Sequence, residues 1–410
     1  MSRGLARRFF AMLIVFGCVF GAFSSRDARP NFSDFKVYWV AGEKAAEHRT
    51  VYDVQGHYQF KYSPFVALLW APPAAFLPGT RYHWAWLNYG ACGVGWLAVF
   101  YVLARFCHPA RTLAAWLSVW CVFTIGLRDE LKLGQANLWP FLLVLPAWFI
   151  RAPSKPRRPG LDALGIAVGA AWGLAVQWKL YALVLGPLWL LRRRVDVALG
   201  ALAVTALTLG PVLALAHGWP MAMSENVRWL QSLTASSEYL LISEFNVSVI
   251  GVLGKWTGVA GGPVATHVYV VWAALAAAWA VTLVWAERDA VRRAQPFFTF
   301  WSASWAWAGI VVLNPLVWPY WLLFCAPLYV AYLSDVLATG LRATDFRFWS
   351  VSGWFTLMNW MQNSSFAHQG GALSAVLLLQ ADAFARAYNR DRAQLAQLSQ
   401  LRLSATSTPA

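Results

Sequence analysis

The most promising residue for chemistry is a single carboxylate, Asp34, at the start of the polar and aromatic segment 34–64. This segment directly follows the first apolar stretch of the chain, residues 9–24. A carboxylate beside a membrane and aromatic rings is partly removed from water, which raises its pKa and makes it a better base. Asp34 could then take the proton of an acceptor hydroxyl while that oxygen attacks an activated carbon. A solvated loop residue, or the N-cap of a helix over 35–47, explains the same aspartate equally well.

An aromatic residue of the same segment, Tyr62, precedes Ser63 and Pro64 and follows the pair Tyr52-Asp53. A tyrosine before Ser-Pro fits a turn at the membrane interface, where its ring can line a sugar or a lipid headgroup. Residue type alone favours the simpler interpretation, an anchor in the interfacial aromatic belt.

A third candidate is the charged cluster 128–132, which is followed by the two amides Gln135 and Asn137. Side-chain amides at a membrane boundary can bind hydroxyl groups, and Arg128 or Lys132 could meet a phosphate. The equally supported alternative is that the charges pair with one another while the amides cap the next helix.

Lys179 interrupts an apolar stretch of about 31 residues, 161–191, that lies between two basic clusters. A lone lysine in such a stretch is costly unless it snorkels to the interface or meets an anion. The flanking helices are short, which places Lys179 near the outer face, where a lipid-linked phosphate would lie. Phosphate contact is therefore favoured over snorkelling.

Two further segments, 243–251 and 314–321, contain Asn246 and Trp318. Asparagine, proline and tryptophan are ordinary residues of loops and of the aromatic belt, so each segment alone is a weak signal.

The composition shows what must position these residues. Of 410 residues, 59% are hydrophobic and 12% are charged, whereas a soluble domain carries roughly 25% charged residues. The 26 tryptophans also suit a bilayer interface. The five cysteines have no CxxC spacing and the seven histidines form no HxxxH pair, so neither predicts a disulfide framework or a metal site.

Apolar stretches recur along nearly the whole chain and predict an all-α polytopic membrane protein. We expect one membrane domain over 1–388 and a polar cytoplasmic tail over 389–410. The segment 62–78 contains four prolines and resembles a re-entrant or interfacial helix pair. The predicted apolar segments are 9–24, 83–104, 112–127, 135–151, 161–177, 180–191, 195–216, 266–286, 296–313, 318–333, 347–361 and 371–388.

Basic residues predict the orientation. Alternate connections and the tail carry 21 of the 33 lysines and arginines, among them the run 192–194. The positive-inside rule places these connections and the N-terminus in the cytoplasm, and the long loops 25–82 and 217–265 outside it. The net charge of +15 then reflects this bias rather than affinity for nucleic acid. A cleaved signal peptide over 1–24 is less favoured, because no small-x-small cleavage site follows.

Taken in order, these segments resemble glycosyltransferase family 87, the polyprenol-phosphate-mannose type of the GT-C superfamily. The resemblance extends over about 34–330. The blocks that carry it are Asp34-Phe35-x-x-Tyr38, Tyr52-Asp53, Phe60-x-Tyr62-x-Pro64, Gly134-Gln135-x-Asn137, Lys179 after Gly173-Leu174-Ala175, Leu190–Arg194, Asn246-x-Ser248-x-x-Gly251 and Asn314-Pro315-x-x-Trp318.

The resemblance implies a GT-C bundle of about 11–13 transmembrane helices with extracytoplasmic loops forming the active site. It implies a polyprenyl-phosphate sugar donor, mannose above all, a glycolipid or glycan acceptor, and Asp34 as the general base of an inverting displacement. The donor phosphate would meet Lys179 first, then Arg128, Gln135 and Tyr320. The residues implied for substrate contact are Tyr38, Tyr62, Asn137, Asn246 and Trp318.

Two departures from the family pattern concern the substrate. Many members carry Ser-Pro-x-Ser-Trp followed by His-His, whereas this chain has 314–321 with Tyr320 in that region. A tyrosine can replace a hydrogen bond but not a cation. The family's frequent Asn-Gln-Ser is Asn246-Val247-Ser248 here.

No DxD pair or Walker loop is present, so we expect no nucleotide donor and predict no cofactor. Lone carboxylates do not exclude a divalent metal, yet no ligand cluster stands out. The rival function is a transporter or flippase of a lipid-linked sugar, which would place charged or Gly/Pro-broken segments at the membrane midplane. The polar residues gather at one face instead, which favours an enzyme, located in the bacterial inner membrane.

Overall fold

The structure, a computed structural model, consists of helices and connecting loops in the part of the chain that it describes. The first apolar stretch, Asp53 and the basic loop 151–158 lie outside the described residues. Those residues are 30–52, 60–150, 162–235, 241, 243, 245–257, 265–293, 296–339, 346–361, 365 and 367–406.

Four helical segments of this described part are long and apolar enough to cross a membrane: Arg81–Cys107, Pro109–Leu133, Val195–His217 and Thr266–Arg288. A helix needs about 20 apolar residues to span the hydrocarbon core. Exposed apolar side chains recur along Arg81–Cys107, Val195–His217 and Thr266–Arg288, as they do on lipid-facing surfaces. The protein is therefore an all-α polytopic membrane protein, as predicted, while the number of 11–13 crossings stays a prediction.

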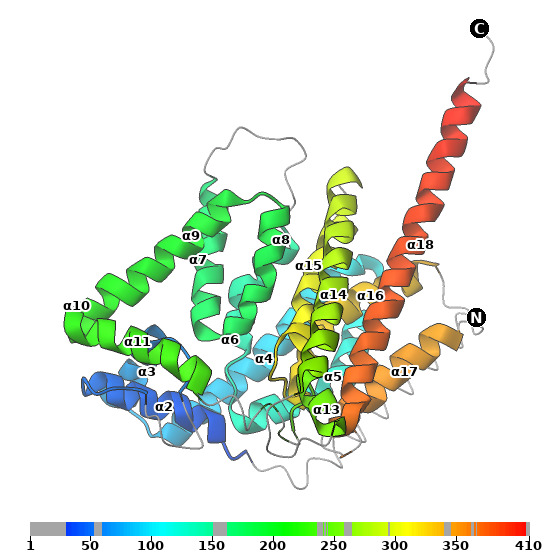
Figure 1. The fold of residues 1–410 in the computed structure, drawn as a ribbon. Helices are drawn as coiled ribbons and strands as arrows, with labels where there is room; N and C mark the ends of the chain where they lie inside the picture. The colour runs from blue at the N-terminus through cyan, green and yellow to red at the C-terminus, as the bar shows by residue number, and fades with distance from the viewer. Residues whose placement is uncertain are drawn as a thin grey trace.

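These segments correspond to labelled helices in Figure 1. They are α4 (Arg81–Cys107), α5 (Thr112–Leu133), α9 (Val195–Leu207) continued through a π-turn by α10 (Leu213–His217), and α14 (Thr266–Arg293). Shorter helices fill the space between them: α6 (Leu138–Val144), α7 (Ala163–Trp178), α8 (Gly186–Leu191), α15 (Pro296–Leu313), α16 (Ala326–Thr339) and α17 (Phe346–Trp360). The last helix, α18 (Ala372–Thr406), continues through most of the predicted tail.

The core is aromatic. Trp148 and Trp307 are buried with their ring centroids 5.8 Å apart at 72°, an edge-to-face arrangement that aromatic pairs prefer. Helices α7 and α9 approach closely at Gly169. A Cβ there would lie only 2.0 Å from the carbonyl oxygen of Val197. Small residues allow such contact between apolar helices, where no hydrophobic effect drives association.

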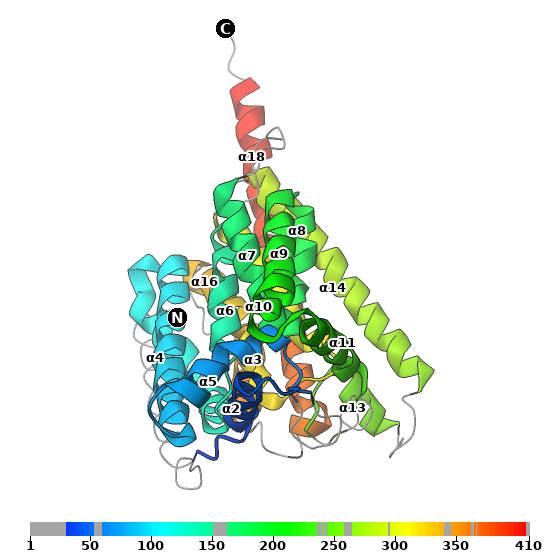
Figure 2. The ribbon, with the colours of Figure 1, turned by 90° about the vertical axis from the view of Figure 1, so that its left-hand side faces the viewer.

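The bundle has two distinct ends. In Figures 1 and 2, α2 (Ser33–Ala46), α3 (Pro64–Ala71), α11 (Trp219–Ala235) and α13 (Val249–Trp256) all lie toward the lower end. The turn between α8 and α9 and the C-terminal parts of α14 and α18 lie at the upper end. The basic run 192–194 is thus at the end opposite to Asp34.

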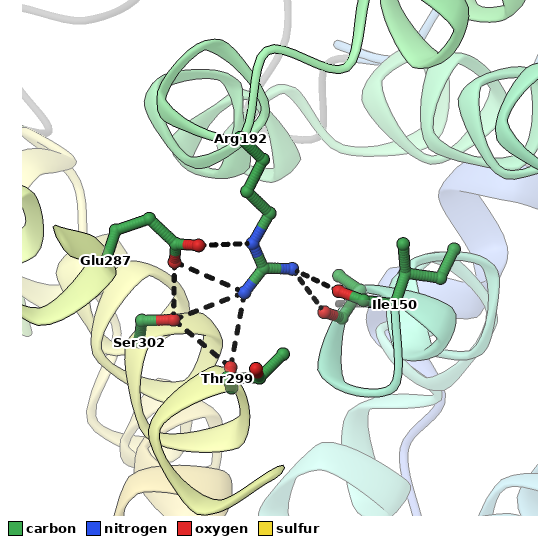
Figure 3. Close-up of polar contacts among 6 residues, drawn as sticks. Ile150, Arg192, Glu287, Thr299 and Ser302 are labelled. Carbon is green, nitrogen blue, oxygen red and sulfur yellow. Dashed lines mark hydrogen bonds and ion pairs between the residues drawn. The ribbon is translucent and has the colours of Figure 1, made fainter. Parts of the chain in front are cut away.

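A buried arginine fastens the upper end (Figure 3). Arg192 donates to Glu287 from Nε at 3.0 Å and from Nη2 at 3.3 Å. Nη1 donates to the carbonyl oxygens of Ala147 and Ile150 at 3.0 and 2.9 Å. Nη2 also reaches the carbonyl oxygen of Thr299 and Ser302 Oγ, each at 3.2 Å. All five guanidinium hydrogens therefore have acceptors, which a buried arginine requires.

At the lower end, α3 packs against α2. The ring of Phe35 meets that of Trp70 edge-on at 5.1 Å, and a Cβ at Gly42 would lie 2.5 Å from the carbonyl oxygen of Trp70. The helical segment Pro64–Phe76, which ends in a π-turn, is too short to span a bilayer. This geometry agrees with the re-entrant or interfacial interpretation of 62–78.

Candidate functional site

Asp34 lies in the first turn of α2, where the helix dipole favours a carboxylate. Helix α2 begins at Ser33 with Phe32 at the N-cap position, so the alternative that Asp34 caps the helix is wrong. The backbone N–H groups of Asn31 and Phe32 both donate to the carbonyl oxygen of Lys132 at 3.1 Å. These bonds fix the start of α2 against the end of α5.

Gly134 permits this close approach. Its φ is 70°, a left-handed conformation that closes the C-terminus of α5. A Cβ at this position would lie 2.7 Å from Cβ of Phe35, so a side chain would push α2 away. The turn brings the next residue, Gln135, to the side chain of Asp34.

Gln135 joins three of the residues singled out from the sequence. Its Nε2 donates to Asp34 Oδ2 and, at 2.9 Å, to the hydroxyl of Tyr320. Its Oε1 accepts a hydrogen bond from Lys179 Nζ at 3.3 Å. One buried amide thus links a carboxylate and an ammonium group that are 145 positions apart in the chain.

Lys179 lies between the end of α7 and the start of a 3₁₀ helix, Leu180–Leu185. Its backbone is extended, which interrupts the helix within the apolar stretch. Nζ donates to the hydroxyl of Tyr62 at 3.0 Å and lies 4.6 Å from the centre of the Tyr62 ring. Among the described residues, no carboxylate lies within ion-pair distance of this ammonium group. Two of its three N–H groups are bonded to neutral partners among the described residues, so a third donor is left for a ligand.

Aromatic rings form one wall of the site. Tyr62 stacks on Tyr38 with centroids 4.9 Å apart, and Tyr38 lies 5.8 Å from Trp70. The backbone holds Tyr62 in place, because its carbonyl oxygen accepts a 2.6 Å bond from the hydroxyl of Tyr52 and Ser63 N donates to Gln177 O at 3.0 Å. Tyr62 is partly exposed whereas Tyr38 is fully buried, so Tyr62 is the ring of this stacked pair that can contact the apolar face of a sugar.

A second set of buried polar contacts adjoins Gln135. Asn137 Nδ2 donates to Glu130 Oε2 at 2.7 Å, and Asn137 Oδ1 accepts from the hydroxyl of Tyr181 at 3.0 Å. The backbone N–H of Gln135 donates to the carbonyl oxygen of Glu130 at 3.0 Å. Asn137 is fully buried, and both the nitrogen and the oxygen of its amide are hydrogen-bonded, so it supports the site rather than facing a ligand.

The comparison with protein families agrees with this arrangement. Residues 60–300, more than half of the chain, match glycosyltransferase family 87. The chain belongs to glycosyltransferase family 87. It is thus a membrane glycosyltransferase. None of the curated proteins and none of the solved structures matches the chain.

The matched range contains Tyr62, Gln135 and Lys179 of this family 87 protein, whereas Asp34 and Tyr320 lie outside it. The structure places those two residues beside Gln135 through hydrogen bonds. The polar network thus connects the part of the chain that matches the family with segments before and after it.

The sequence alone does not single out Glu130, because it lies among the charged residues of the cluster 128–132. The structure pairs Arg128 with Asp129 at 2.8 Å and turns Glu130 inward. The signal was the helical spacing, since the buried residues Phe123 and Leu127 continue to Glu130 on one face of α5.

Three predicted residues of the glycosyltransferase have other partners. Arg128 is held by Asp129, so of the two cations predicted for the donor phosphate only Lys179 lacks a contacting carboxylate among the described residues. Asn246 Nδ2 donates to the carbonyl oxygens of Leu241 and Pro315, each at 2.9 Å, so its amide joins two loops. The ring of Trp318 lies 6.5 Å from that of Phe245. Their roles in substrate or phosphate binding stay predictions.

The electrostatics favour Asp34 as a proton acceptor. Burial raises the pKa of the Asp34 carboxyl above its ordinary value, while the nearby charge of Lys179 and the hydrogen bond from Gln135 act in the opposite direction. A raised pKa makes the ionised carboxylate a stronger base. The described residues contain no group of three or more His, Cys, Asp or Glu that could hold a metal ion.

Proposed function

We propose that this glycosyltransferase moves a sugar from a polyprenyl-phosphate donor to a hydroxyl of a glycolipid or glycan, with inversion at the anomeric carbon. One observation carries the proposal: a single amide, that of Gln135, bonds both to Asp34 and to Lys179. A base and a cation are the two groups that such a transfer needs. The resemblance described above supports mannose as the sugar.

Asp34 acts as the general base. The acceptor hydroxyl gives its proton to the Asp34 carboxylate while the acceptor oxygen forms a bond to the anomeric carbon. The bond between that carbon and the phosphate oxygen breaks, and the phosphate leaves with the electron pair. In an inverting displacement, the base and the leaving group lie on opposite faces of the sugar, so the two protein groups must be separated. Gln135 provides that separation.

Lys179 binds the leaving phosphate. Its ammonium group faces developing negative charge in a site from which water is largely excluded, where electrostatic stabilisation is strong. Gln135 donates to the hydroxyl oxygen of Tyr320, so the hydroxyl proton of Tyr320 can be donated to the same phosphate. Tyr62, with Tyr38 stacked against it, holds the sugar. Because Arg128 is paired with Asp129, we assign it a smaller role.

The active site faces away from the cytoplasm. The basic residues 192–194 and 288–293 belong to the opposite end of the bundle (Figures 1 and 2), and basic residues on short connections favour the cytoplasmic side. A polyprenyl phosphate is anchored in the bilayer, so its phosphate lies at the depth of the membrane boundary. The position of α2 and α3 at one end of the spans supports this placement, in a bacterial inner membrane.

The test is the substitution Asp34→Asn in purified protein reconstituted in liposomes with a labelled prenyl-phosphate sugar and an acceptor glycolipid. The amide keeps the shape but accepts no proton, so transfer should fall by about 10²–10⁴-fold, the range of general-base catalysis. Donor binding should persist. Asp162→Asn is the matched control, because Asp162 caps α7 at the other end of the bundle and should leave transfer within about twofold.

Near-normal transfer by the Asp34→Asn variant would remove Asp34 from the mechanism. The same liposomes distinguish the rival function: movement of the labelled donor across the bilayer without release of prenyl phosphate would identify a flippase.

A further inference from the structure

Helix α11 carries an apolar stripe that no described part of the chain covers. The sequence predicts that 217–265 is a long loop outside the cytoplasm, yet it contains this helix, in which Trp219, Met223, Val227 and Leu230 have exposed fractions of 58%, 57%, 50% and 61%. At 3.6 residues per turn these four side chains lie within an arc of about 80°. A stripe of this kind is unusual on a surface that faces water.

The rest of α11 divides into two further faces. Ser224, Arg228 and Gln231 are also exposed and lie on the next arc, of about 60°. The buried residues Ala222, Glu225 and Trp229 occupy the remaining side, which packs against the bundle. The helix therefore has one apolar exposed face, one polar exposed face and one face in contact with protein.

The buried face of α11 hydrogen-bonds to the backbone at two positions, Val51 and Lys61. Glu225 Oε2 accepts a hydrogen bond from the backbone N–H of Val51 at 3.0 Å. Trp229 Nε1 donates to the carbonyl oxygen of Lys61 at 3.2 Å, one residue before Tyr62. Any displacement of α11 would thus act directly on the segment that carries Tyr62.

The apolar stripe continues a lipid-facing surface. Helix α10 completes the span Val195–His217, whose exposed apolar residues include Leu207 and, at 88% exposure, Leu215. The chain then turns at Gly218, with φ of 82°, and α11 runs across the end of that span (Figure 1). An amphipathic helix that leaves a membrane span in this way, with a polar face beside the apolar one, matches the geometry of a helix in the bilayer interface.

We propose that α11 lies in the membrane interface, with Trp219, Met223, Val227 and Leu230 among the lipid acyl chains. Its polar face meets the headgroups and water, and its inner face fixes the Val51 and Lys61 segments at a constant depth. The partner is the bilayer itself, in the leaflet at the Asp34 end of the bundle. This inference does not depend on the proposed reaction.

The experiment measures depth at single positions of the full chain. An environment-sensitive fluorescent amino acid is introduced at position 223, at 228 on the polar face, or at 202, which lies on the exposed apolar side of α9. Each protein is reconstituted at less than one chain per vesicle into phosphatidylcholine liposomes with nitroxide-labelled acyl chains. Quenching at 223 should approach that at 202 and exceed that at 228 by about threefold.

Equal quenching at 223 and 228 would overturn the proposal. So would quenching at 223 that disappears when several chains share a vesicle, because a second copy would then be the occupant. If the probe at 223 prevents folding, the same comparison is made with the probe at 227, which lies on the same stripe.

Discussion

Two buried cations at opposite ends of the bundle show how the same kind of group can serve different purposes. Arg192 has an acceptor for every guanidinium hydrogen, including a bidentate contact with Glu287. Among the described residues, Lys179 hydrogen-bonds to neutral groups alone, those of Tyr62 and Gln135. A fully satisfied buried charge holds elements together, whereas a buried ammonium group without a contacting carboxylate is ready for an anion.

The glycosyltransferase therefore separates its structural and its chemical polar clusters. The Arg192 cluster connects α8, α14 and α15 with the 3₁₀ helix Leu145–Trp148 that follows α6, and these elements lie far from α2 in Figure 1. The Lys179 cluster joins α2, the Gln135 turn and the start of the 3₁₀ helix that contains Tyr320. Substitutions in the two clusters should affect different measurable quantities.

The largest expected effect concerns stability. Arg192→Met leaves Glu287 buried without its partner, which costs about 3–5 kcal/mol when one member of a buried ion pair is removed. Denaturation in detergent should show this loss, and the double variant Arg192→Met/Glu287→Met should recover most of it. If Arg192→Met is as stable as the wild type, the cluster does not have the structural role that its geometry indicates.

The next effect concerns donor binding. Lys179→Met should weaken binding of a prenyl-phosphate sugar by about 100-fold, because a charge-assisted contact in a site of low polarity contributes about 1.5–3 kcal/mol. Its stability should be unchanged or higher, since methionine removes a buried charge that has no contacting carboxylate. A loss of stability like that of Arg192→Met would contradict the distinction between the two cations.

The smallest effect concerns the buried hydrogen bond between Asn137 and Glu130, next to the site. Glu130→Gln keeps an oxygen that accepts from Asn137 Nδ2, so its free energy of unfolding should change by less than about 1 kcal/mol. Glu130→Ala leaves that donor unpaired and should cost about 1–3 kcal/mol. Thermal unfolding of both variants checks the difference. Equal costs would indicate that the charge of the Glu130 carboxylate, rather than its hydrogen bond with Asn137, stabilises this part of the protein.

Much of the fold followed from the sequence, because apolar stretches and basic connections reflect the bilayer directly. The predicted segment 195–216 corresponds to α9 and α10, and the break at Lys179 separates α7 from the following 3₁₀ helix. The amphipathic α11 was missed, since its apolar stripe of four residues is interrupted by polar residues in the sequence.

The candidate site was predictable as a set of residues but not as a network. Asp34, Gln135 and Lys179 each departed from their surroundings in the sequence. Their contact depends on long-range packing, above all on the Gly134 turn that lets α2 approach α5. The side-chain amide of Asn246 is a group that often binds ligands. Its partners are instead backbone groups of two loops that no local sequence pattern brings together.

The central claim is that Asp34 accepts the proton of the acceptor while Lys179 holds the donor phosphate. The most direct test measures binding and single-turnover transfer of one labelled prenyl-phosphate sugar in the same preparations of the wild type, Asp34→Asn and Lys179→Met. We predict that Asp34→Asn binds the donor normally and transfers almost nothing, and that Lys179→Met binds it weakly. Rapid transfer by donor-saturated Asp34→Asn would contradict the account.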